Sequence, residues 1–185
     1  MEKGKRTIDP EMLGFVKGKV EGLLRSTGRK GVEELISFMD TNGYYTAHCG
    51  RHHRFGGGMS QHCLEVYMYM KNHNSIGMPM DSLIIVALLH DLCDIKYCRD
   101  IEHGHHGYRS VRLLQTQVPE FDLHEDERKL INWHLGRINA GGDLRKEALA
   151  VHDTPEWQLL HRADIESAGH QKTRMGLRDM MNNDN

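Results

Sequence analysis

The feature that most constrains this chain is an aliphatic run, Leu83–Leu89, that is followed at once by the polar pair His90 and Asp91. The run is much shorter than the ~20 apolar residues that a membrane-spanning helix needs. It therefore predicts an element buried inside a folded domain, with a histidine and a carboxylate at its end. Because a buried charge is costly unless it is paired or bound to a metal, other parts of the chain must supply partners for this pair.

Most of the chain shows the apolar spacing of amphipathic helices. Met12, Val16 and Val20 follow this spacing near the N-terminus, and "DTNGYY" predicts a turn after a second helical segment. Further helices are expected at about residues 60–73, 81–94, 106–115, 125–136 and 155–169, with a short one at 143–152. Asp81 is the expected N-cap of the aliphatic helix. No segment alternates with a period of two, so we predict an all-α helical bundle.

The chain of 185 residues suits one domain with a sizeable core. We expect residues 1–43 to form N-terminal helices that pack on this core. Residues 44–170 should form the domain that carries the function, and residues 171–185 should be a partly flexible C-terminal tail. Residues 46–58 are rich in glycine, histidine and arginine and predict a loop.

Composition argues against several classes of function. The formal net charge is -2, so no overall basic field attracts nucleic acid or an anionic membrane. The four cysteines form no CxxC pair, which argues against a zinc knuckle, and they are too few for a disulfide framework. The opening stretch "MEKGKRTIDPEML" lacks the apolar centre of a signal peptide. We therefore expect a cytoplasmic protein without a membrane partner.

A metal site is the chemistry that the remaining polar pattern favours. The chain has 14 histidines, and histidine is the commonest protein metal ligand. His62 lies beside Val66, four residues on in an expected helix, and Asp164 lies between the apolar Ala163 and Ile165 in another. With His90 and Asp91 they would form a mixed nitrogen and oxygen site that suits a divalent first-row metal. Each residue alone is more often simply packed or solvated, but their joint occurrence on three expected helices favours a metal.

This order of residues resembles the HD-domain phosphohydrolase superfamily, which is named for its His-Asp doublet. His62, the doublet and Asp164 match the first histidine, the doublet and the final aspartate of that pattern. The segments "RHHRFGGGMSQHCLEVY", "HHGYRSVRLLQ" and "INWHLG" are similar to segments of small stand-alone members with additional histidines. The resemblance covers about residues 44–168. It implies the helical bundle of an HD domain.

The resemblance also implies a site for two divalent metal ions, of Mn, Fe, Ni, Zn or Mg. The implied ligands of the first ion are His62, His90, Asp91 and Asp164. Asp91 bridges to the second ion, whose further ligands are His106 and His134. His105 is a rival to His106, although the spacing before "SV" favours His106. His134 could instead be a packed residue beside Trp133.

Groups that bind and cleave a phosphate ester are implied in the same way. The candidate phosphate-binding cations are Arg51, Arg54, Lys96 and Arg109. The candidate catalytic groups are Asp91, His52 and His53, of which an imidazole would protonate the leaving oxygen. The alternative for these histidines and cations is an ordinary place in a loop or on the solvated surface.

One position departs from the family pattern. Many members carry lysine three residues after the aspartate of the doublet, where this chain has Asp94. An acidic group there would repel a phosphate. The positive charge would then have to come from Lys96 or Arg109.

The function that the resemblance implies is hydrolysis of a phosphomonoester or phosphodiester in a nucleotide or a related small phosphate, by attack of a metal-bridging hydroxide. Three alternatives remain open. The same ligands resemble those of HD-type di-iron oxygenases, and the domain could also be a non-catalytic module that binds a nucleotide or a metal. A 3′–5′ exonuclease ranks lower, because the chain has neither a separate nucleic-acid-binding module nor a basic surface charge. The sequence leaves the oligomeric state open.

Overall fold

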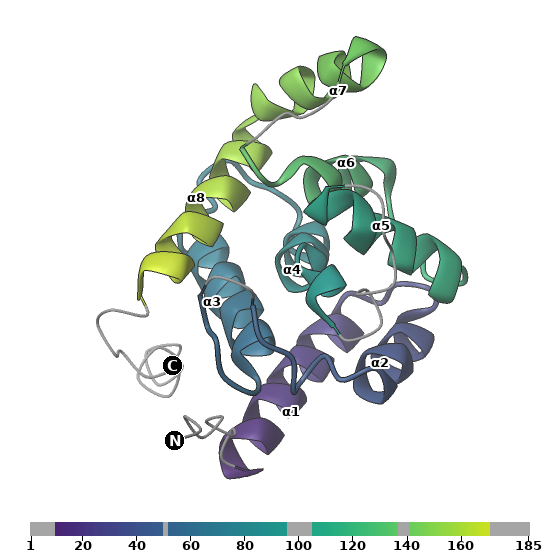
Figure 1. Cartoon of the computed structure of the whole chain (residues 1–185), viewed down its shortest axis with the longest axis vertical. Coiled ribbons are helices and arrows are strands. Elements are labelled where there is room, and N and C mark those ends of the chain that lie inside the picture. Colours follow the sequence, from purple (N-terminus) through teal and green to yellow (C-terminus); the bar gives the residue numbers. More distant parts are fainter. Residues whose placement is uncertain (1–9, 50–51, 96–104, 137–140, 171–185) are drawn as a thin grey trace, which may run out of the picture.

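The computed structural model describes residues 10–49, 52–95, 105–136 and 141–170. Within these ranges the chain forms eight α-helices, one short 3-10 helix and no strand (Figure 1). The helices are α1 (Pro10–Ser26), α2 (Val32–Thr41), α3 (Gly58–Asn72), α4 (Met80–Leu89), η1 (Leu92–Asp94), α5 (His106–Gln117), α6 (Glu125–Trp133), α7 (Gly142–His152) and α8 (Pro155–His170). The predicted all-α bundle is thus confirmed.

Helix α4 lies at the centre of the bundle, because apolar side chains cover all of its faces. Every residue from Leu83 to Leu89 is buried. Helices α1, α3 and α6 all pack against α4, and Figure 1 shows it enclosed by the other elements. A helix surrounded in this way carries whatever follows it into the interior, which explains why His90 and Asp91 are buried as well.

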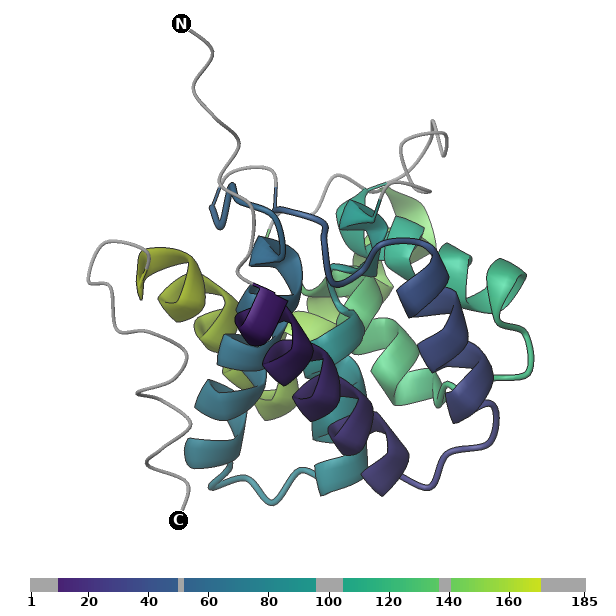
Figure 2. The same ribbon diagram turned by 90° about the horizontal axis from the view of Figure 1, so that it is seen from below.

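The two N-terminal helices share this core. Helix α1 lies across α3 and α4 (Figure 2), and its Val16, Val20 and Leu24 are fully buried. Helix α2 packs against α1 through one face, as its apolar spacing indicates. The described part of segment 1–43 therefore belongs to the same hydrophobic core as the rest of the chain.

The predicted N-cap at Asp81 is wrong. Helix α4 begins at Met80, and Pro79 precedes it without a side-chain cap. The Asp81 carboxylate instead accepts a hydrogen bond from the Arg29 guanidinium at 2.9 Å, and the same guanidinium binds the buried carboxylate of Glu127. Asp81 thus ties α4 to the turn between α1 and α2 rather than closing its own helix.

Two predicted helices end several residues earlier than expected, and in each the C-cap residue is a histidine. The expected helix 81–94 stops at Leu89, after which η1 forms a separate 3-10 turn. The expected helix 125–136 stops at Trp133, with His134 as its C-cap. Side chains satisfy backbone groups near the first break: Tyr44 donates to the carbonyl of Leu88, and Ser110 donates to the carbonyl of His90.

The described part of the chain contains no helix with both the length and the apolar character needed to cross a lipid bilayer.

Candidate metal centre

The carboxylate of Asp91 lies between two pairs of histidines. Its Oδ2 is 3.6 Å from Nε2 of His62 and 3.7 Å from Nε2 of His90. Its Oδ1 is 2.8 Å from Nε2 of His106 and 3.4 Å from Nε2 of His134. Each oxygen therefore faces a different pair of imidazoles, as a carboxylate shared by two cations would.

Asp164 joins the pair that faces Oδ2. Its carboxylate is 3.2 Å from Nε2 of His62, which is itself 3.2 Å from Nε2 of His90. The packing of α8 against α3 creates this contact across 102 positions of sequence. The four residues implied as ligands of a first ion thus lie together, and none of them is exposed.

A chain of hydrogen bonds orients the ring of His62 through its Nδ1 atom, on the side away from Asp164 and His90. Nδ1 of His62 lies 2.9 Å from the hydroxyl of Ser167, and this hydroxyl donates to the carboxylate of Glu65 at 2.7 Å. Because the Ser167 proton points to Glu65, its oxygen accepts from Nδ1–H of His62. The other ring nitrogen, Nε2, then faces Asp164 and His90. Partners of this kind commonly set the ring orientation and tautomer of a metal ligand.

Backbone carbonyls orient two further imidazoles in the same way. Nδ1 of His90 donates to the carbonyl of Ala87 at 2.9 Å, and Nδ1 of His134 donates to the carbonyl of Ile131 at 2.8 Å. In both rings Nε2 is the nitrogen that faces the centre. Nε2 of His134 is fully buried and makes no hydrogen bond with any of the described residues. A buried lone pair without a partner is costly, and a metal ion would satisfy it.

A glycine allows His106 to reach Asp91. Helix α5 approaches α6 so closely at Gly107 that a Cβ atom there would lie 2.1 Å from the carbonyl oxygen of Ile131. This approach brings the rings of His106 and His134 to 5.8 Å. The rival His105 stacks on Trp133 at 4.6 Å and accepts from the amide of Tyr108 at the start of α5. The structure thus places His106, and not His105, against Asp91.

The polar groups of the centre shift the pKa values of one another. Burial opposes ionisation of Asp91, but His90 and His106 outweigh it and hold the pKa of Asp91 well below its usual range. Burial also opposes ionisation of Asp164, yet its hydrogen bond with His62 lowers its pKa to about 2. Against the effect of burial, Asp91 raises the pKa of His106 to about 9. Without metal, the positive charge of protonated histidine thus balances the negative charge of the carboxylates. Divalent cations would bind in place of those protons.

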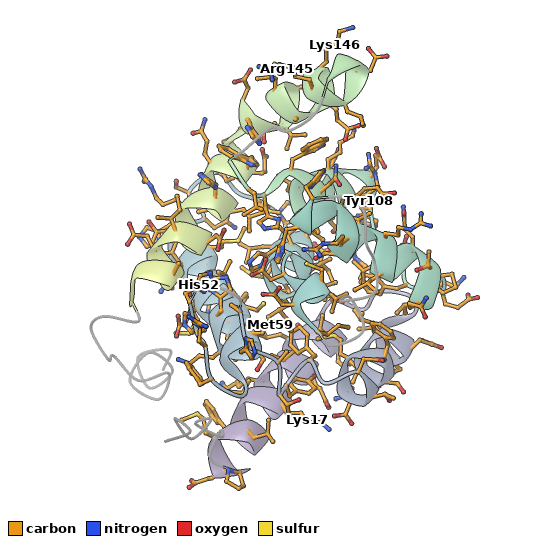
Figure 3. All side chains as sticks on the ribbon, in the orientation of Figure 1. Lys17, His52, Met59, Tyr108, Arg145 and Lys146 are labelled. Atoms are coloured by element: carbon orange, nitrogen blue, oxygen red, sulfur yellow. The ribbon has the colours of Figure 1, made fainter. Side chains whose placement is uncertain are left out.

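His52 and His53 lie at different depths. The half-buried His52 stands beside α3 (Figure 3), with its ring 4.5 Å from that of His62. Burial, and then the charge of His62, lower the pKa of His52. His53 is buried behind it, and its Nε2 lies 3.0 Å from Glu65. Its position suits support of the centre more than contact with a substrate.

The candidate phosphate-binding cations are only partly placed. Arg51 and Lys96 lie outside the described residues. Arg54 is exposed, and no described interaction joins it to the metal-centre side chains. Arg109 is half-buried, and its Nε is buried without a hydrogen-bond partner among residues 10–49, 52–95, 105–136 and 141–170. Its charge acts on both His106 and Asp94. Of the two described candidates, Arg109 and not Arg54 is therefore the one that the fold brings to the centre.

Sequence reasoning missed three supporting residues, Glu65, Ser167 and Ser110. Glu65 follows His62 by three positions and Ser167 follows Asp164 by three positions, a spacing that puts each pair on one helix face. That spacing was the available signal. Ser110 stands in the "SV" of the matching segment "HHGYRSVRLLQ", but its role was not predicted; it accepts from the amide of Cys93 and donates to the carbonyl of His90.

Comparisons of this chain with protein-family models, with curated proteins and with solved structures found no match.

Proposed function

We propose that this chain is a metal-dependent phosphohydrolase of the HD type, which acts on a phosphomonoester or phosphodiester of a nucleotide or a related small molecule. The observation that carries the proposal is the position of Asp91, whose two oxygens face two separate pairs of imidazoles. Imidazole and carboxylate donors of this kind suit divalent first-row metals.

The donors fall into two groups that share Asp91. His62 and His90 would hold one ion with it, joined by Asp164 beside His62, and His106 and His134 would hold the other. When bound, such a pair of ions lowers the pKa of water enough to supply a nucleophile at neutral pH and takes up charge on phosphoryl oxygens. The six side chains already converge, so little reorganisation would accompany binding.

Residues around the centre have roles that follow from their positions. Glu65 and Ser167 hold the ring of His62, while the charge of Arg109 would attract a negatively charged phosphate. His52 borders His62 and is the imidazole available to exchange a proton with a leaving oxygen. Burial lowers the pKa of His52, which makes the protonated ring a stronger acid toward a leaving oxygen.

A di-iron oxygenase is the second candidate, because Asp94 weighs against an approaching phosphate and the same ligand types can bind iron. The Asp94 carboxylate lies 3.8 Å from Nε2 of His106 and adds negative charge where a phosphate would approach. The ligand types alone suit iron as well as manganese.

Metal analysis combined with two assays tests the proposal. Protein purified without oxygen should contain divalent metal and should release nitrophenol from an aryl phosphate monoester or diester. A chelator should abolish this release, and added Mn²⁺ should restore it. The matched variant Asp91→Ala should lose most of the metal and the activity. Failure to cleave either ester with any of several metals would reject the hydrolase. Oxygen uptake on an added polyol would then support the oxygenase.

A further inference from the structure

We propose that Asp94 is itself a metal ligand and that it completes the cation site on the His106 side of Asp91, an inference that rests on the proposed metal centre. The site would then have two carboxylates, Asp91 and Asp94, and two imidazoles, His106 and His134. This donor set suits a divalent first-row cation. It assigns a role to the residue that departs from the family pattern.

The local backbone brings the two carboxylates together. The α-helix ends at Leu89, and η1 follows, closed by a hydrogen bond of 2.9 Å from the amide of Asp94 to the carbonyl of Asp91. In a 3-10 turn the side chains at positions i and i+3 eclipse each other. Asp94 therefore stands over Asp91, and carboxylate oxygens of the two lie within 4.8 Å of one another.

Ser110 fastens this turn to the helix that carries His106. Its buried hydroxyl accepts from the amide of Cys93 at 3.0 Å and donates to the carbonyl of His90 at 2.8 Å. Ser110 follows His106 by one helical turn on α5, so the same helix holds both η1 and the imidazole. The distance of 3.8 Å between Oδ1 of Asp94 and Nε2 of His106 is thus set by ordered elements on both sides.

His134, on the same side, independently indicates a cation site. Nε2 of His134 is fully buried, has no hydrogen-bond partner in the described part of the chain, and lies 3.4 Å from the Oδ1 of Asp91 that His106 also contacts. This unpartnered imidazole nitrogen and the two adjacent carboxylates together offer lone pairs that a cation would bind.

Arg109 is the competing partner for Asp94, but its contact is indirect. Its charge acts on Asp94, yet among the described residues no hydrogen bond or ion pair joins the two side chains. The Asp94 side chain remains 19% accessible, so a cation could reach it without rearrangement of the core.

The added ligand changes the expected balance between the two ions. With only Asp91, His106 and His134, the second ion would have three protein ligands and would be the easier one to lose. A fourth donor from Asp94 would give the two ions equal numbers of ligands. The two should then bind with comparable affinity.

Titration of the metal-free protein with Co²⁺ tests this assignment, because the visible absorption of Co²⁺ reports its ligands and calorimetry reports its affinity. The wild type should bind two ions per chain. Asp94→Asn should leave the affinity of the ion at His62 and His90 unchanged. It should weaken binding of the ion at His106 and His134 at least tenfold and change the spectrum of that ion. Asp94→Glu, which keeps the charge, should restore much of the loss. Asp143→Asn removes an equally charged but 96% accessible side chain on α7 and serves as the control.

The assignment is overturned if Asp94→Asn binds both ions with the affinity and spectrum of the wild type, or weakens them only as much as Asp143→Asn does. Asp94→Ala gives the same test if the amide disturbs the turn. The titration needs no substrate, so its result is separate from that of the hydrolase assay. A wild type that binds two ions but cleaves no ester rejects only the function, and a wild type that binds no Co²⁺ overturns both.

Discussion

Ser167 on α8 accepts a hydrogen bond from Nδ1 of His62 on α3, at 2.9 Å and across 105 positions of sequence. The same hydroxyl donates to Glu65, which in turn binds His53. All four side chains are buried. The ring of His62 is therefore held from one side while its Nε2 faces Asp91 and Asp164 on the other.

We expect Ser167→Ala to weaken metal binding tenfold to a hundredfold, as the loss of such supporting hydrogen bonds commonly does. The change removes only an oxygen atom, so the fold should persist. Metal affinity measured by competition with a chelator checks the result. Ser60→Ala is the control, because Ser60 is equally buried on α3 but its hydroxyl donates to the carbonyl of Gly57, away from the metal-centre side chains. Equal affinities for the two variants would contradict the role of Ser167.

His134→Ala and His106→Ala should each leave about one ion per chain and should cut turnover steeply, because the proposed chemistry needs both ions. Elemental analysis and ester hydrolysis measure the two effects. His134→Ala should also lower stability, since His134 is fully buried, whereas His106 is half-buried. The exposed His73, which bonds to its own helix, provides the control His73→Ala. Two ions and full activity in both variants would reduce the centre to a single-ion site.

Gly107→Ala should disturb the centre although Gly107 binds nothing. Its Cβ would meet the carbonyl oxygens of Ile131 and Asn132, so α5 must move away from α6 and take His106 with it. We expect a loss of about 1–3 kcal/mol in the free energy of unfolding, the usual cost of overpacking, together with weaker binding of the ion at His106. Denaturant unfolding and metal titration measure both. Gly18→Ala on α1, where no atom lies within 4 Å, should be neutral or slightly stabilising.

Metal binding should release protons and should strengthen as the pH rises from about 7 to 9. In the metal-free protein Asp91 raises the pKa of His106 to about 9, so this imidazole is protonated at pH 7 and must lose its proton to become a ligand. Above pH 9 the dependence should level off. Calorimetry in buffers with different ionisation enthalpies counts the released protons. Binding without proton release at pH 7 would show that His106 is not a ligand.

The same shift predicts how the stability of the metal-free protein depends on pH. A histidine whose pKa is raised on folding stabilises the folded state below its ordinary pKa near 6.5, and this contribution disappears as the pH rises through the folded value. The thermal midpoint of the metal-free protein should therefore fall between about pH 6.5 and 9. His106→Gln should show a smaller fall over this range. An equal fall in the variant would assign the effect to other groups.

The sequence by itself determined the fold class and the central position of α4. Helical spacing reports which side of each segment is apolar, and the run Leu83–Leu89 has no polar side that could face water. Such a helix must lie inside a bundle and must carry His90 and Asp91 inward. Because the residues of this one segment are all apolar, its burial is predicted without knowledge of which elements pack against it.

The tertiary structure decided how the polar groups face one another. The break after Leu89 and the contact of Asp91 with two pairs of imidazoles depend on neighbours that arrive from distant parts of the chain. The local turn η1 places Asp94 over Asp91, but Ser110 of α5 fastens that turn. Stacking on Trp133 is what turns His105 away and leaves His106 to contact Asp91. Periodicity identifies a buried side of a helix but carries no information about the atoms opposite it, because those contacts arise only when α3, α5, α6 and α8 close around α4.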